Sequence, residues 1–128
     1  MISKRAFLAA AALSVAWVAS PALADEFLGS YVARIGKADH FASDGYPLDT
    51  AAQMVRQDRA NYHKFGKRDG ADQSDPWFRT AAGRARFEKM LNKQGAMSGA
   101  TRQAIAGGTP IVEVEVYRNS VRVNVIGY

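Results

Sequence analysis

The C-terminal part of the chain holds two runs in which valine alternates with polar or aromatic side chains. This period of two in β-branched residues is typical of strands that bury one face of a sheet. A two-residue loop at positions 119–120 would place Val116 opposite Val123. The same register pairs Val114 with Val125 on that face. The pattern therefore predicts a C-terminal β-hairpin, and the rest of the fold must complete its sheet.

Residues 27–36 fit two interpretations. The apolar side chains there match a helical stripe, whereas Tyr31, Ala33 and Ile35 would share one face of a strand. Because two strands alone rarely form a stable sheet, we favour a third strand in this segment.

Three helices are predicted between these strands. Thr50 and Gln53 have the form of a capping box, and Asp75 followed by Pro76 fits the start of a second helix. The predicted helices span about residues 50–65, 75–92 and 98–106. We expect an α+β domain in the order β-ααα-ββ, with the three helices packed on one face of a small antiparallel sheet.

The first 24 residues have the pattern of a signal peptide. Lys4 and Arg5 precede an apolar run at residues 6–18, which is too short to span a bilayer comfortably. A small-x-small pattern then ends at Ala24, where we expect cleavage. The mature protein would be one small domain, residues 25–128, periplasmic in a Gram-negative bacterium or fully secreted.

The composition excludes several kinds of site. The sequence contains no cysteine, so it has no disulfide, thiolate nucleophile or thiolate metal ligand. Two histidines without a His-Glu-x-x-His pattern do not indicate zinc. Carboxylates are frequent in residues 69–75, but they lack the spacing and final Glu of an EF-hand loop. We therefore expect no metal ion and no other cofactor.

Three charged side chains fall on the apolar sides of the predicted helices. Asp58 lies inside the apolar arc of the first helix, and Arg84 and Glu88 lie inside that of the second. A buried carboxylate must be paired or neutralised, so we expect Asp58 to meet Arg84 in a structural ion pair between the helices. Two alternatives are Arg59 folding back onto Asp58, and a polar cleft in which the pKa values are shifted.

The basic residues are concentrated in the middle of the chain. Removal of Lys4 and Arg5 would lower the formal net charge from +5 to +3. Arg56, Arg59 and His63 would form a basic stripe on the first helix. Such a stripe fits an acidic envelope protein or an anionic lipid surface, whereas nucleic acid is disfavoured outside the cytoplasm.

The two histidines are the candidates for catalysis. His40 follows Asp39 in a polar loop, and His63 lies on the basic stripe. Acting together as acid and base, they could serve a small metal-independent, ribonuclease-like hydrolase of phosphodiesters, which is our alternative function. Our leading interpretation is a non-catalytic, exported binding protein that presents its basic helix face to an acidic partner. Its predicted binding residues are Arg56, Arg59, His63, Asp39 and His40.

Overall fold

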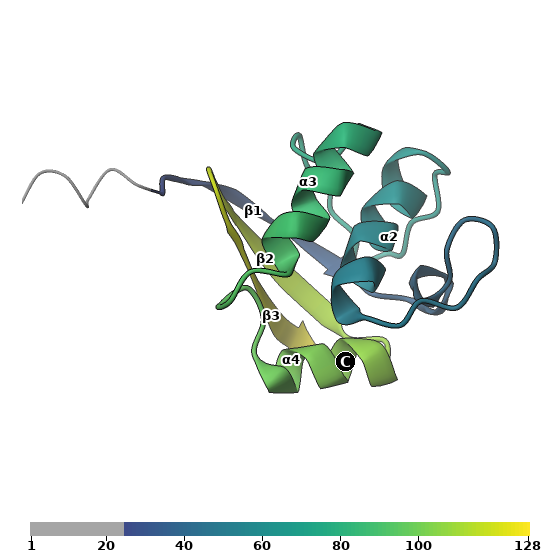
Figure 1. Cartoon of the computed structure of the whole chain (residues 1–128). Coiled ribbons are helices and arrows are strands. Elements are labelled where there is room, and N and C mark those ends of the chain that lie inside the picture. Colours follow the sequence, from purple (N-terminus) through teal and green to yellow (C-terminus); the bar gives the residue numbers. More distant parts are fainter. Residues whose placement is uncertain (1–24) are drawn as a thin grey trace, which may run out of the picture.

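The computed structural model describes residues 25–128, which form a three-stranded antiparallel sheet with helices on one face (Figure 1). The strands are β1 (Phe27–Arg34), β2 (Ile111–Tyr117) and β3 (Val121–Gly127). The helices are the 3₁₀ helix η3 (Lys37–His40), α2 (Ala51–His63), α3 (Ala81–Leu91) and α4 (Gly99–Gly107). The predicted α+β class and element order are confirmed. The predicted signal peptide and its cleavage site lie outside the described residues. Within residues 25–128 no helix is long and apolar enough to cross a membrane.

The sheet has β2 in its middle, between β1 and β3. The prediction of a strand over residues 27–36 is therefore confirmed by β1. Tyr31, Val114 and Val123 lie side by side across the three strands and are buried. Their row faces the helices and forms part of the hydrophobic core, which also contains Phe78 and Phe87 in a stacked pair.

The predicted hairpin is present, but its predicted register is wrong by two residues. Val116 lies opposite Val121, and Val114 lies opposite Val123. Val125 lies opposite Val112, two residues closer to the start of β2 than the predicted partner Val114. Because the shift is an even number of residues, the same valines still face the core.

Contacts from Asp25, which precedes β1, accompany this register. The hairpin turn closes with a 2.8 Å hydrogen bond from the backbone N–H of Tyr117 to the carbonyl oxygen of Ser120. The Asp25 carboxylate accepts hydrogen bonds from the backbone N–H of Asn119 and from the Ser120 hydroxyl. Local turn preferences cannot anticipate a partner so distant in the sequence.

The capping prediction for α2 is confirmed. The Thr50 hydroxyl accepts a 3.2 Å hydrogen bond from the backbone N–H of Gln53, whose side chain returns to the backbone N–H of Thr50. The helix ends at His63 rather than at Phe65. Gly66 follows with a φ of 66°, which is the left-handed conformation that glycine adopts without strain.

The second long helix begins later than predicted. Its first residue is Ala81, and Thr80 is its N-cap, with a 3.0 Å bond from the backbone N–H of Gly83 to the Thr80 hydroxyl. Asp75 does accept hydrogen bonds from backbone N–H groups of the segment 76–80. That segment remains a turn, because the extended backbone of Thr80 (φ −103°, ψ 156°) separates it from α3.

The outer edge of β1 is covered by the segment that leads to α3. The side-chain oxygens of Asp72 and Gln73 accept hydrogen bonds from the backbone N–H groups of Arg34 and Val32. The backbone N–H of Gln73 donates to the carbonyl oxygen of Val32 at 2.8 Å. This cover satisfies an edge that would otherwise be open to pairing with another chain.

Candidate functional site

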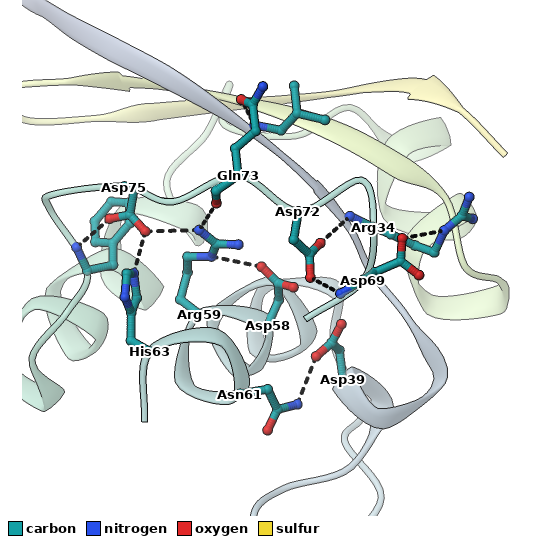
Figure 2. Close-up of polar contacts among 12 residues, drawn as sticks. Arg34, Asp39, Asp58, Arg59, Asn61, His63, Asp69, Asp72, Gln73 and Asp75 are labelled. Carbon is teal, nitrogen blue, oxygen red and sulfur yellow. Dashed lines mark hydrogen bonds and ion pairs between the residues drawn. The ribbon is translucent and has the colours of Figure 1, made fainter. Parts of the chain in front are cut away.

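A buried arginine lies at the centre of the polar cluster between α2 and β1 (Figure 2). Arg59 Nε donates to Asp58 Oδ2 at 2.8 Å, and Arg59 Nη1 donates to Asp75 Oδ1 at 3.0 Å. The exposed fraction of the Arg59 side chain is 0%. One guanidinium therefore serves two buried carboxylates.

Aromatic rings enclose this guanidinium. Its central carbon lies 4.1 Å from the ring centroid of Tyr31 and 4.6 Å from that of Tyr62. Arg68 lies over the Tyr62 ring as well, at 4.2 Å. Arg59 Nη2 and the Tyr31 hydroxyl are buried without a hydrogen-bond partner among the described residues. The arrangement holds α2 against β1 and leaves no path from Arg59 to a binding partner.

Asp75 joins the buried cluster to His63. His63 Nε2 lies 2.6 Å from Asp75 Oδ1, and the His63 side chain is only 9% exposed. Asp75 Oδ2 accepts hydrogen bonds from the backbone N–H groups of Trp77 and Phe78. Burial opposes ionisation of Asp75, but the hydrogen bonds from His63 and Arg59 outweigh it and lower its pKa.

The pKa values of the neighbouring carboxyl groups are raised rather than lowered. Burial raises the pKa of Asp58 well above its ordinary value, although Arg59 acts against the shift. Burial also raises the pKa of Asp39, which accepts a 2.8 Å hydrogen bond from the Asn61 side chain. Burial therefore disfavours the ionised form of both carboxyl groups.

The expected ion pair between Asp58 and Arg84 is not formed. Asp58 is buried as expected, but its partner is Arg59, which was the second choice from sequence. Arg84 Nη1 instead donates to the carbonyl oxygens of Phe78 and Arg79, at 3.1 and 2.9 Å. The late start of α3 explains the difference, since it leaves these carbonyls within reach of Arg84.

The expected basic stripe is not a continuous surface. Arg59 is buried, so its predicted role in binding is wrong, and His63 is largely covered. Arg56 is 38% exposed and contacts Glu88 at 3.2 Å. Phe65, the last residue of the predicted helix, is 43% exposed, because α2 ends before it.

The histidines do not share a partner. His40 Nε2 lies 2.7 Å from the carbonyl oxygen of Gly108, whereas His63 contacts Asp75. The cavity of about 290 Å³ beside His40 is lined by Lys37, Phe41 and the end of α4, and His63 is not among its lining residues. Catalysis by this pair would need both rings in one cleft.

The structure places an exposed basic and aromatic surface at the C-terminal end of α2, which the sequence reasoning did not single out. Phe41 and Phe65 are each 43% exposed and line a cleft of about 360 Å³ together with Lys67. The Lys64 ammonium lies 5.3 Å from the centroid of the Phe65 ring. We call these four residues, Phe41, Lys64, Phe65 and Lys67, the Phe41–Phe65 surface. The available signal was the run from Lys64 to Arg68 around Gly66, because it spans the predicted end of the helix at about residue 65.

The predicted loop residues border this surface without forming it. Asp39 is buried and bonded to Asn61, which lines the floor of the same cleft. His40 lies beside Phe41, on the η3 helix. Asp39 therefore positions the cleft rather than contacting a partner.

No family model matches the chain, and no curated protein or solved structure is found to be similar to it. Within residues 25–128, no three or more His, Cys, Asp or Glu side chains are arranged as a metal-binding site. The geometry of the described residues is therefore the basis for any inference about function.

Proposed function

We propose that the protein is an exported binding protein that takes up an acidic polypeptide partner on the Phe41–Phe65 surface. Export is proposed from the charged, apolar and small-x-small pattern of residues 1–24. The observation that carries the binding proposal is the cleft between Phe41 and Phe65, with Lys67 in its lining and Lys64 beside it.

The cleft fits an apolar side chain flanked by carboxylates. Large exposed aromatic rings cost free energy in water, and a partner side chain inserted between them would remove part of that cost. Lys64 and Lys67 are exposed and would meet acidic residues on either side of such an anchor. A walled cleft of this size supports a polypeptide over an anionic lipid surface, which presents no single side chain to insert.

No observation favours the phosphodiester hydrolase over binding. His63 is held by Asp75 and largely buried, and His40 faces the end of α4. The proposal therefore assigns binding, and not catalysis, to this domain.

The proposal is tested by cross-linked capture with the tagged protein from the envelope fraction of its native host, at low and high salt. We expect one dominant acidic protein that is lost at high salt. Phe41→Ala and the double variant Lys64→Gln/Lys67→Gln should each reduce its recovery at least about tenfold, which corresponds to roughly 1.4 kcal/mol of binding free energy.

Lys89→Gln is the matched control, because Lys89 is an exposed lysine on α3 away from the cleft. Recovery with this variant should equal that of the unchanged protein. Equal recovery with the cleft variants, or enrichment of anionic lipid without a protein, would contradict the proposal.

A further inference from the structure

A further cavity lies on the outer side of α2, between α3 and the loop at residues 42–48. Its volume is about 460 Å³, which is within the range of small-molecule sites. Gln53, Arg56 and Gln57 line it from α2, and Arg84 and Glu88 line it from α3. These residues lie on one face of each helix, so the groove is built by the packing of the two helices.

Arg84 is the unusual member of this groove. It is 94% buried, since its relative exposure is 6%, yet among the described residues no carboxylate lies within 4 Å of its guanidinium. The carbonyl oxygens of Phe78 and Arg79 satisfy Nη1 but do not neutralise the charge. Burial and the neighbouring Arg56 guanidinium lower the pKa of Arg84.

The position of Arg84 in α3 makes its unneutralised positive charge still less favourable. It lies in the first turns of the helix, whose N-terminal residue Ala81 also lines the groove. The N-terminal end of a helix carries a partial positive charge, so a cation there is unfavourable and an anion is favourable. A bound anion would interact favourably with the positive end of the helix dipole. It would also offset the repulsion between the guanidinium groups of Arg84 and Arg56.

Other donors at the groove can turn towards an anion. Arg56 makes one 3.2 Å contact with Glu88, and both side chains are about a third exposed. Exposed pairs of this kind contribute little free energy, so Arg56 can share its guanidinium with a ligand. The side-chain oxygen of Gln53 accepts hydrogen bonds from the backbone at the start of α2, which leaves its NH₂ group as a donor.

We propose that this groove binds a small molecule through an oxyanion, a phosphoryl or carboxylate group, held between the guanidinium groups of Arg84 and Arg56. The groove adjoins the Phe41–Phe65 surface, because Lys64 lines the groove and Ala42 and Ser43 line both cavities, but its two arginines take no part in that surface. It does not depend on the proposed protein partner.

Isothermal titration calorimetry with pyrophosphate and with citrate tests the proposal, with sodium chloride of equal ionic strength as the solvent control. We expect saturable one-to-one binding of at least one of these anions at millimolar concentration. Binding of pyrophosphate alone assigns a phosphoryl ligand, and binding of citrate alone assigns a carboxylate ligand. Arg84→Lys should weaken binding about tenfold, because lysine keeps the charge but loses the paired donors.

Two variants separate binding from folding. Glu88→Gln removes the carboxylate that competes for Arg56 and should tighten binding, which a purely structural role of Arg84 does not predict. Lys89→Gln removes a positive charge on α3 outside the groove, which controls for a general change in net charge, and should leave the affinity within about twofold. If neither anion saturates, or if Lys89→Gln weakens binding as much as Arg84→Lys and Glu88→Gln does not tighten it, the proposal is wrong.

Discussion

The burial of Arg59 shows how a side chain that is usually exposed becomes part of a core. Its charge is met by Asp58 and Asp75, and its planar group is covered by Tyr31 and Tyr62. A desolvated guanidinium is stable only where hydrogen bonds and opposite charges replace water. The cluster therefore couples α2 to β1 and to the segment before α3.

Replacement of Arg59 should be strongly destabilising. Arg59→Met keeps much of the volume but leaves Asp58 and Asp75 buried without their counter-charge. We expect a loss of about 3 kcal/mol or more in the free energy of unfolding, measured by chemical denaturation. Arg68→Met is the control, since Arg68 lies over Tyr62 from an exposed position and should cost less than about 1 kcal/mol. Equal losses for the two variants would contradict a special role for Arg59.

The raised pKa of Asp58 predicts a dependence of stability on pH. A carboxyl group whose pKa is higher in the folded than in the unfolded state takes up a proton on folding. The stability that this proton uptake contributes is fully present below the pKa of about 3.9 in the unfolded state. It is lost as pH rises through the pKa of the folded state.

Asp58→Asn imitates the protonated carboxyl group. The free energy of unfolding of this variant, relative to that of the unchanged protein, should be highest at neutral pH. The difference should disappear as pH falls towards about 4. Urea denaturation across that range gives the difference directly. Below about 3.9, both proteins should lose stability as Asp75 is protonated, because the pKa of Asp75 is lowered in the folded state. A difference between the two proteins that does not change with pH would show that Asp58 stays ionised.

At the scale of elements, the start of α3 gives the clearest prediction. Thr80→Ala removes the side-chain oxygen that accepts from the backbone N–H of Gly83, while leaving Asp75 in place. We expect a loss of about 1 kcal/mol in the free energy of unfolding, the usual cost of a lost N-cap. Thr80→Ser keeps the hydroxyl and should restore most of the stability. If α3 instead started at Pro76, Thr80→Ala would have little effect.

Local patterns were enough to predict the existence and type of most elements. The alternating valines predict β2 and β3, and the Thr50–Gln53 capping box predicts the start of α2, because both depend on neighbours in sequence. The hairpin register is accompanied by contacts from Asp25, which no local rule includes. The 3₁₀ helix η3 was missed for a different reason: its contact is local, from the backbone N–H of Gly36 to the Asp39 carboxylate, but a single turn is too short to produce a periodic pattern.

The candidate site was harder to predict than the fold. A helical wheel placed Asp58 correctly inside but left Arg59 on the adjoining stripe, because a wheel assigns faces by angle and ignores partners. The helical wheel does not include Asp75, which accepts a hydrogen bond from the buried Arg59 side chain and lies 16 residues further along the chain, beyond the end of α2. Likewise, Phe65 is exposed because the helix ends at His63, two residues earlier than predicted.

At the scale of the whole molecule, α2 has two roles on opposite sides. Its inner side holds the Arg59 cluster, and its outer side borders both the groove at Arg84 and the cleft at Phe65. Figure 1 shows α2 flanked by α3 and by the loop that leads out of η3. A rigid inner side keeps the outer side preorganised, which reduces the entropy lost on binding.

The most direct test of the binding proposal is to map where an acidic peptide contacts the protein. Isotope-labelled protein is titrated with a synthetic peptide of glutamates that surround a single phenylalanine, and backbone amide shifts are followed by NMR. We predict salt-sensitive shifts centred on Phe41, Phe65 and Lys67, which are lost with Lys64→Gln/Lys67→Gln and kept with Lys89→Gln. Shifts centred on the outer face of the sheet, or no shifts at low salt, would contradict the proposed function.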